Sequence, residues 1–178
     1  MAKKILNGVL AATVALIIVV ALQPAKYTIT RTITVAATPA KVFPLVNNIH
    51  RWNDWSPWAK SDPSQKVTYE GPQSGKGAVQ SWKGNKTGTG RMELVQSQPN
   101  RLVRFSFEFH TPMAGSAEAE FKFAPAGKGT SVTWSMTGSN SFMGKAFNLL
   151  MNMNKMLGNM LEKGLDGIKS QAEGPIKK

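Results

Sequence analysis

The chain contains no cysteine and only two histidines, His50 and His110. Without cysteine it has no disulfides, no thiolate metal ligands and no cysteine nucleophile. Two histidines are too few for most zinc sites, so we expect neither a metal nor another cofactor. A domain without disulfides has to be stable through its hydrophobic core alone, and about 150 residues are enough for that.

Acidic residues are also scarce, since 10 Asp and Glu stand against 22 Lys and Arg, which gives a formal net charge of +12. The basic residues are scattered from Lys26 to Lys178 rather than clustered. Such a surface beside a membrane predicts attraction to anionic lipid headgroups, although a solvated surface without a partner is equally compatible with it. No basic run has interleaved aromatic residues, so we do not expect nucleic acid as a partner.

An obvious catalytic constellation is missing as well. No serine lies in a Gly-x-Ser-x-Gly turn, and no loop resembles a phosphate cradle. Both histidines are expected to be solvated, and Asp54 and Glu70 could reach a pocket mouth but have no evident partner. We therefore assign no catalytic residue and do not favour an enzyme. The other carboxylate candidates, of which the last three fall on wet strand faces, are Glu93, Glu108, Glu118 and Glu120.

A long apolar run is present at the N-terminus, where Lys3 and Lys4 precede eighteen uncharged residues from Ile5 to Leu22. A helix of that length spans roughly 27 Å at about 1.5 Å per residue, close to the hydrocarbon thickness of a bilayer. We interpret residues 1–25 as a membrane anchor or an uncleaved signal. The run exceeds the usual signal core of about 7–15 residues, although residues 19–21 could serve as a cleavage site. The positive-inside rule places the domain on the extracytoplasmic (periplasmic) side.

The next segment begins with a strand pattern. Residues 27–35 carry threonine at every even position and apolar residues at four of the five odd ones. Thr38 and Pro39 predict a short helix with a threonine cap, and residues 47–55 predict a second one. Six further strand patterns with one apolar face each are typical of an antiparallel sheet covered on one side. They occupy residues 67–70, 77–82, 87–96, 102–110, 118–123 and 130–137.

The pattern from Ser141 to about Gln171 predicts one long amphipathic helix, because apolar and polar residues occupy opposite arcs. At about 1.5 Å per residue it would form a rod of ~45 Å. A strongly curved sheet wrapped around this helix lets both bury their apolar sides, which predicts an α+β fold. Gly164 lies in the apolar arc, where it predicts either close packing or space for a ligand, and we favour close packing.

Several short motifs are distinctive, namely residues 38–43, 52–58, 75–77 with Trp82, 88–90 and 162–165. In these motifs the chain resembles the START/Bet v 1-like (SRPBCC) superfamily, in its polyketide cyclase/dehydrase and lipid transport branch. The resemblance implies a helix-grip fold over residues 26–173, with a cavity between the curved sheet and the C-terminal helix. It does not imply one chemistry, because members of the superfamily include cyclases, lipid carriers and hormone receptors. Residues 174–178 form a basic tail.

We expect the apolar faces of the strands and of the last helix to line that cavity, and Trp52, Trp55 and Trp58 either to fill the core or to line the pocket mouth. A hydrophobic small molecule or lipid is the expected partner, bound by a monomer. The alternatives are a cyclase/dehydrase-type enzyme and a structural domain whose cavity is below about 300 Å³. The predicted ligand-binding residues are Trp55, Trp58, Trp82, Met92, Phe105, Phe107, Phe121, Trp134, Met136, Leu150, Met153, Leu157, Met160 and Leu161.

Overall fold

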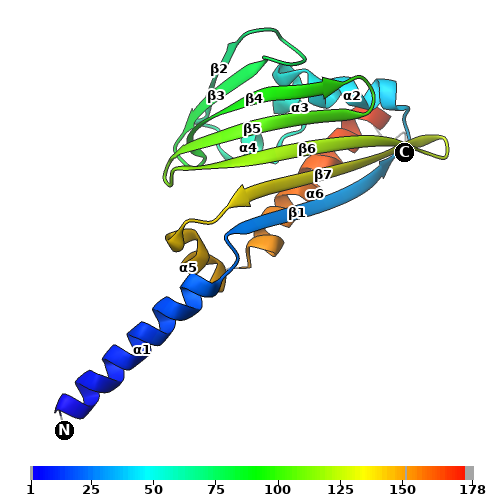
Figure 1. Ribbon diagram of the computed structural model, residues 1–178. Coiled ribbons are helices and arrows are strands. Elements are labelled where there is room, and N and C mark those ends of the chain that lie inside the picture. Colours follow the sequence, from blue (N-terminus) through cyan, green and yellow to red (C-terminus); the bar gives the residue numbers. More distant parts are fainter. Residues whose placement is uncertain (1, 151, 175–178) are drawn as a thin grey trace.

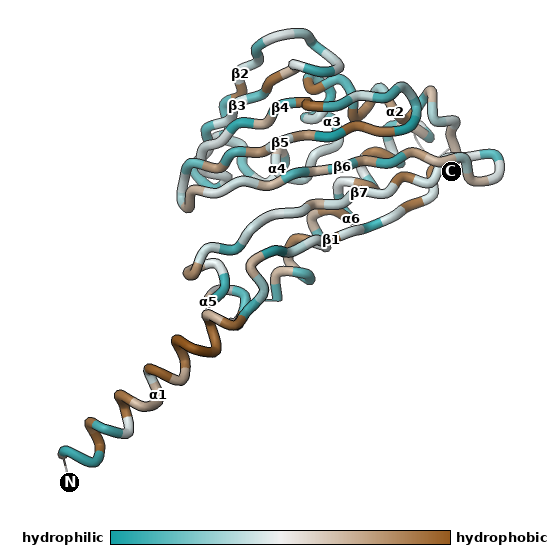
Figure 2. The backbone as a smooth tube through the Cα atoms, in the orientation of Figure 1, coloured by the Kyte–Doolittle hydropathy of each residue, from teal (hydrophilic) through white to brown (hydrophobic). Residues whose placement is uncertain are grey.

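The computed structural model describes residues 2–150 and 152–174, with the side chains of all of these except Phe147 and Leu150. An N-terminal helix, α1 (Ala2–Leu22), projects away from the rest of the chain (Figure 1). It is long and apolar enough to cross a membrane, and nearly all of it is exposed in the structure. Figure 2 shows its apolar residues concentrated toward its C-terminal half. The predicted basic tail from residue 175 onward lies outside the described residues.

One antiparallel sheet of seven strands forms the body of the described chain, in the order β1-β7-β6-β5-β4-β3-β2. The strand predicted first is β1, and the six further strand patterns are all present as β2 to β7. A segment of short helices separates β1 from β2. The strands are β1 (Lys26–Val35), β2 (Lys66–Glu70), β3 (Val79–Gly84), β4 (Gly88–Gln98), β5 (Leu102–Thr111), β6 (Gly115–Ala126) and β7 (Gly129–Ser139).

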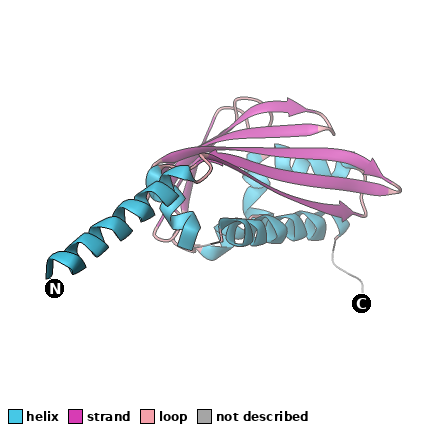
Figure 3. Cartoon of the chain, turned by 60° about the horizontal axis from the view of Figure 1, so that its bottom comes forward, coloured by secondary structure: helices cyan, strands magenta, loops and turns pink. Residues whose placement is uncertain are grey.

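The helices of the domain lie on one side of this sheet (Figure 3). The long helix α6 packs against β1, α2, α3 and α4. This arrangement is the helix-grip fold that the sequence predicted, because the apolar face of the sheet and the apolar arc of α6 bury each other. The helices are α2 (Pro39–Asn47), the 3-10 helix η1 (Ile49–Arg51), α3 (Trp52–Trp55), α4 (Pro57–Ser61), α5 (Phe142–Leu150) and α6 (Met153–Glu173).

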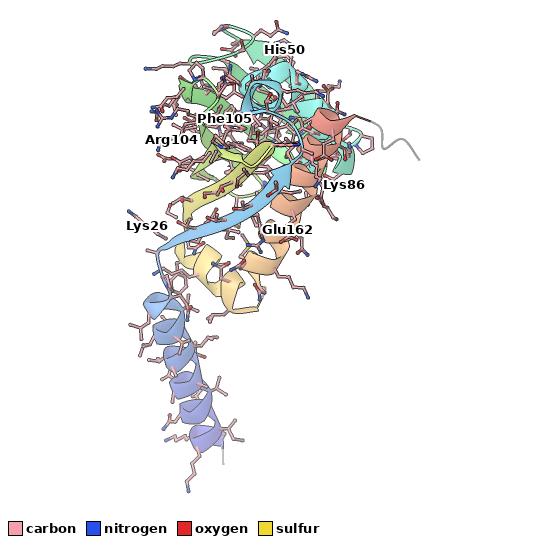
Figure 4. All side chains as sticks on the ribbon, turned by 90° about the vertical axis from the view of Figure 1, so that its right-hand side faces the viewer. Lys26, His50, Lys86, Arg104, Phe105 and Glu162 are labelled. Atoms are coloured by element: carbon pink, nitrogen blue, oxygen red, sulfur yellow. The ribbon has the colours of Figure 1, made fainter. Side chains whose placement is uncertain are left out.

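Side chains alternate between a buried and an exposed face along the strands of the sheet, as predicted. In β5, Val103, Phe105 and Phe107 are buried, while Arg104 is partly exposed. Arg104 and Phe105 are neighbours in the chain, yet Figure 4 shows the first at the margin of the domain and the second inside it. Arg104 pairs with Glu120 on the outer face. The inner face therefore carries the core and the outer face meets solvent.

The prediction of one continuous helix from Ser141 to Gln171 is wrong. The structure has α5 and α6 instead, and Asn152 has a non-helical backbone with ψ of 89°. Its side-chain oxygen accepts a hydrogen bond from the backbone N–H of Lys155 at 2.9 Å. Asparagine favours helix caps over helix interiors because its side chain competes for backbone groups. The predicted cap at Thr38 also fails, since its side chain makes no capping hydrogen bond, although Pro39 does begin α2.

The break at Asn152 gives α5 a different position from α6. α5 lies beside the C-terminal end of α1 (Figure 1). The Nζ of Lys145 donates a hydrogen bond to the carbonyl of Ala21 at 3.0 Å. The backbone N–H of Asn140, just before α5, donates to the carbonyl of Ala25 at 2.7 Å. The end of the apolar helix and α5 are therefore held together.

Glycines bring α6 close to its neighbours. A Cβ on Gly164 would lie 2.6 Å from the ring of Trp134, and one on Gly167 would lie 2.5 Å from the carbonyl oxygen of Trp55. These distances are shorter than ordinary van der Waals contacts, so a larger residue would force the helix away. The prediction of close packing at Gly164 is confirmed.

Candidate ligand-binding cavity

A cavity of about 490 Å³ lies between the inner face of the sheet, the helices α3 and α4, and the first turns of α6. It exceeds the roughly 300 Å³ that marks the lower end of typical ligand sites. The sequence predicted a cavity between the sheet and the C-terminal helix alone, but α3 and α4 also contribute residues to its wall. Its lining consists of Tyr27, Trp52, Asn53, Ser56, Trp58, Ala59, Ser61, Gln65, Gln80, Trp82, Lys86, Thr87, Met92, Phe107, Phe109, Trp134, Met136, Met153 and Leu157.

Aromatic rings form much of the wall. The rings of Trp58 and Trp134 are 5.7 Å apart, and those of Trp82 and Phe107 are 6.3 Å apart. Both pairs lie in the range where offset or edge-to-face contacts are favourable. Because each ring holds its neighbours in place, the wall is a rigid apolar surface.

Two cross-strand pairs of an aromatic residue with glycine support this wall. Trp82 of β3 lies opposite Gly90 of β4, and Tyr27 of β1 lies opposite Gly138 of β7. A Cβ on Gly90 would lie 2.3 Å from the Trp82 ring, and one on Gly138 would lie 2.5 Å from the Tyr27 hydroxyl. Each glycine therefore leaves room for its aromatic partner to lie over the sheet.

The three clustered tryptophans divide between core and wall. Trp55 is fully buried and does not border the cavity, whereas Trp52 and Trp58 do. The indole N–H of Trp52 donates to the carbonyl of Val46 at 2.9 Å, and that of Trp55 to the carbonyl of Leu45 at 2.8 Å. Both acceptors are in the last turn of α2, where carbonyls have no helical partner. The tryptophans thus fix α2 against the core.

A carboxylate network holds the loops at one side of the cavity. Asp62 accepts hydrogen bonds from the Ser64 hydroxyl at 2.5 Å, the Lys86 backbone at 2.7 Å and the Thr87 backbone at 2.9 Å. These bonds, above all those from Ser64 and Thr87, hold the pKa of Asp62 well below its usual value. The carboxylate stays ionised and is occupied by hydrogen bonds, so it orders the β3–β4 turn rather than acting as a base.

Titratable groups are scarce at the cavity itself. Among the lining residues that the structure describes, Tyr27 and Lys86 are the titratable ones, and no carboxylate or histidine borders the space. Burial raises the pKa of the Tyr27 phenol, which keeps it neutral. Figure 4 shows Lys86 at the margin of the domain. Chemistry that needs a buried acid–base pair therefore has no such pair in the described lining.

The remaining charged candidates lie elsewhere. Asp54 pairs with Arg51 at 3.5 Å, and Glu93 pairs with Arg91 at 3.0 Å. His50 is exposed and stacks on Tyr69, with ring centroids 3.9 Å apart. Within the described residues, no cluster of three potential metal ligands occurs. The carboxylates that the sequence placed on wet faces and the exposed Glu70 and His110 also lie away from the cavity.

Of the fourteen predicted ligand-binding residues, eight border the cavity, namely Trp58, Trp82, Met92, Phe107, Trp134, Met136, Met153 and Leu157. Four others, Trp55, Phe105, Phe121 and Leu161, are buried in the packed core instead. Met160 is half-buried outside the lining, and the side chain of Leu150 lies outside the described residues. Some predicted residues border the cavity and others are buried, because α2, α3 and the closely approaching part of α6 fill one half of the interior. Space remains at the other half.

Sequence reasoning missed several lining residues. Tyr27 and Phe109 could have been found, because each shares the inward parity of its strand with predicted core residues. Gln80 lies two residues before Trp82 in β3 and points to the same inner face, but a polar residue does not fit the apolar alternation by which inward residues were identified. Asn53, Ser56, Ala59, Ser61, Gln65, Lys86 and Thr87 come from short helices and loops, where no periodicity exists to assign a direction.

A second hollow of about 600 Å³ adjoins the first on the side of α1 and α5. Tyr27 and Met153 border both spaces. Leu149 and Asn152, at the junction of α5 and α6, line the second hollow only. The second hollow is therefore partly lined by α5, the helix that lies beside the end of α1.

Comparison with solved structures shows the fold. A protein from Chromobacterium violaceum is 12% identical, with a TM-score of 0.61 over 83% of this chain and 97% of that one. The di-domain ARO/CYC StfQ from the steffimycin biosynthetic pathway is 12% identical, with a TM-score of 0.64 over 84% of this chain and 51% of that one. Ara h 8.0201 is 14% identical, with a TM-score of 0.55 over 84% and 96%.

Sequence comparison gives the family. No curated protein matches the chain. The sequence profile of the family described as polyketide cyclase/dehydrase and lipid transport matches residues 26–173, most of the chain. The match covers the whole sheet and α6, and the predicted resemblance to this branch of the SRPBCC superfamily is confirmed. The chain belongs to the polyketide cyclase/dehydrase and lipid transport family.

Proposed function

We propose that this protein binds a hydrophobic small molecule or lipid in the cavity, at the surface of a membrane. The observation that carries the proposal is a cavity of about 490 Å³ with a largely aromatic and aliphatic wall and no carboxylate or histidine in its described lining. Transfer of an apolar molecule from water into such a space is favourable by roughly 25 cal/mol per Å² of buried apolar surface. Neither a metal nor a cofactor is needed for this.

The membrane part of the proposal rests on α1 and α5. α1 is 21 residues long and contains an 18-residue window with a mean hydropathy of 2.7, and its exposed apolar side chains suit a bilayer. We interpret it as a retained anchor, with a cleaved signal as the alternative. α5 is tied to the end of α1 through Lys145, and it exposes Phe142 and Met143 to 50% and 66%. An apolar surface at that position suits the interfacial layer of the same membrane.

Charge and topology support the rest of this arrangement. The net charge of +12 favours anionic headgroups, and Lys3 and Lys4 favour a cytoplasmic N-terminus with the domain on the extracytoplasmic (periplasmic) side. A ligand that leaves the membrane would reach the second hollow first and would then pass between Tyr27 and Met153. We expect the domain to act as a monomer and not to bind nucleic acid.

The test is ligand recovery from the full chain. The protein is purified in detergent, transferred to nanodiscs and examined by native mass spectrometry and by organic extraction. A fluorescent fatty acid, supplied as its uncharged methyl ester, is then added as the fatty-acid probe. We expect a co-purified apolar molecule or saturable uptake of the probe. An empty protein that takes up no probe would refute the proposal.

An enzyme of the cyclase/dehydrase type is the alternative, because Tyr27 places a neutral phenol at the cavity wall. Such a group can donate a proton to a bound substrate. Conversion of a bound polyketide-like compound that stops in Tyr27→Phe while binding persists would favour the enzyme. A purely structural role is less consistent with the structure, because the cavity is larger than about 300 Å³.

A further inference from the structure

Two residues that line the cavity each have a buried polar atom without a hydrogen-bond partner among the described residues. These atoms are the side-chain oxygen Oε1 of Gln80 and the indole nitrogen Nε1 of Trp134. Gln80 is 7% exposed and Trp134 is 1% exposed, and both residues line the cavity. Folded proteins pair nearly all such atoms, so each unpaired one calls for a physical explanation.

The two residues come from opposite parts of the sheet. Gln80 lies in β3 opposite Met92 of β4, and it shares the inward parity of Trp82. Trp134 lies in β7, between the ring of Trp58 and Gly164 of α6. The sheet therefore holds one unpaired acceptor and one unpaired donor in separate residues of the cavity wall. Their backbone positions are fixed by strand pairing, so neither can leave without disturbing the sheet.

The contrast with the neighbouring tryptophans is informative. Trp52 and Trp55 pack against Trp134, and each donates its indole N–H to a carbonyl of α2. The same fold thus provides partners for those two buried indoles but not for that of Trp134, although Trp52 also borders the cavity. A phenylalanine could fill the same volume without leaving a donor unpaired. The indole of Trp134 therefore has a use beyond packing.

Charge restricts what can pair with these atoms. Lys86 is the charged residue among the described lining, and it is exposed at the margin. An ionised group beside Gln80 or Trp134 would be buried against two uncharged side chains, and a buried charge without a partner is strongly disfavoured. A neutral hydroxyl or carbonyl group meets the requirement, because a hydroxyl can donate to Gln80 and either group can accept from Trp134.

We propose that Gln80 and Trp134 are the polar recognition points of the cavity, and that its ligand is an uncharged apolar molecule bearing hydroxyl or carbonyl groups. This inference rests on the proposed binding function and narrows its ligand class. A plain hydrocarbon leaves both protein atoms unpaired, and a site built around hydrogen bonds rejects an analogue that lacks them. An ionised carboxylate is rejected because it would be buried against uncharged side chains.

Four rigid compounds of one shape test this selectivity: fluorene, 9-fluorenol, 9-fluorenone and fluorene-9-carboxylate. Binding to the full chain in nanodiscs is measured by quenching of tryptophan fluorescence and by calorimetry. We expect 9-fluorenol and 9-fluorenone to bind at least tenfold more tightly than fluorene, and the carboxylate to bind most weakly. Empty nanodiscs provide the correction for partition into lipid.

Variants then assign the two atoms. Gln80→Leu should reduce the affinity for 9-fluorenol about tenfold and leave that for fluorene unchanged or higher. Trp134→Phe should reduce the affinity for 9-fluorenone about tenfold and leave that for fluorene unchanged or higher. Gln98→Leu makes the same substitution as Gln80→Leu at an exposed position of β4, away from the cavity lining, and should leave all affinity ratios unchanged. If Trp134→Phe unfolds, the indole ¹H–¹⁵N resonance of Trp134 in the unchanged protein should move downfield with 9-fluorenone and stay in place with fluorene.

The outcomes separate this inference from the function on which it rests. If the four compounds bind with equal affinity, or if Gln80→Leu leaves the preference for 9-fluorenol intact, the polar recognition is wrong while hydrophobic binding stands. If fluorene binds most tightly, the cavity selects apolar molecules alone. If neither these compounds nor a fatty-acid probe binds, both proposals fail.

Discussion

Trp134 of β7 packs its ring against Gly164 of α6, where a Cβ would lie 2.6 Å from the ring. This contact sets the distance between the sheet and the helix. It also separates the two halves of the interior, because Trp134 borders the cavity on one side and Leu161 and Leu165 belong to the packed core. One glycine thus determines how closely the helix approaches the sheet beside the ligand space.

Gly164→Ala tests this contact. Overpacking of a tight core costs about 1–3 kcal/mol. Alanine regains about 1 kcal/mol of helix propensity, so we expect a net loss of up to about 2 kcal/mol. Urea unfolding followed by circular dichroism measures the change. Gly144→Ala is the matched control in α5, because its Cβ would meet only ordinary contacts at 3.5 Å or more. A stabilising effect at Gly164 would contradict the close contact.

Arg31 tests the link between β1 and α6. It points inward from β1 and donates its Nε–H to Glu162 at 2.5 Å, while its guanidinium covers Gly158. Both side chains are partly solvated, so a double-mutant cycle of Arg31→Met and Glu162→Gln should give a coupling of about 0.2–1 kcal/mol. The coupling should shrink in 1 M salt. A coupling that does not depend on salt would show that packing rather than charge joins the two elements.

Asp62 predicts a pH dependence of stability. Its folded pKa lies below the ordinary value of 3.8, so the unfolded chain binds the proton more readily. The contribution of this carboxylate is present above pH 3.8 and is lost as the pH falls toward the folded pKa. Asp62→Asn should therefore be less stable than the unchanged protein near neutral pH, and the difference should decrease in acid.

Urea unfolding at a series of pH values measures that difference. Asp166→Asn, which removes an exposed carboxylate of α6, is the control for the change in net charge. A difference between the unchanged protein and Asp62→Asn that stays constant from neutral to acidic pH would exclude the hydrogen-bonded carboxylate as its cause.

Filling the cavity should abolish binding without unfolding the domain. Leu157 lines the space, and Leu157→Trp adds a large apolar side chain there. We expect uptake of the fatty-acid probe to fall at least tenfold, with a change in unfolding free energy below about 3 kcal/mol. Met156→Trp is the matched control on the same helix, since Met156 is exposed. Equal loss of uptake in both variants would place the ligand elsewhere.

The membrane anchor predicts a property of the expressed protein. Chain recovered from membranes after carbonate extraction should still contain residues 2–22, because a retained spanning helix is not released by salt or high pH. Intact-mass measurement determines this directly. A protein that begins after residue 21 and is found in the soluble fraction would show that the segment is a cleaved signal.

Several features of this protein follow from the sequence alone. The alternation in β1 and β5 identifies the inward faces, since side chains point to opposite sides of a strand regardless of what surrounds it. The apolar arc of α6 and the length of α1 are likewise local patterns, with periods set by the backbone. These patterns predicted a curved sheet wrapped around an amphipathic helix, and the resemblance to the SRPBCC superfamily implied the helix-grip fold. Eight of the predicted ligand-binding residues line the cavity.

Only the tertiary structure decided which inward residues border empty space. Phe105 and Phe107 share one face of β5, yet only Phe107 lines the cavity. The difference arises from Trp52 and the approach of α6 at Gly164, which come from distant parts of the chain. The break of the predicted rod at Asn152 was also decided by context, because the apolar arc continues past Asn152 although asparagine favours helix caps. The side of the sheet to which a side chain points depends on the strand alone, whereas the empty space beside that side chain depends on all the elements packed against the sheet.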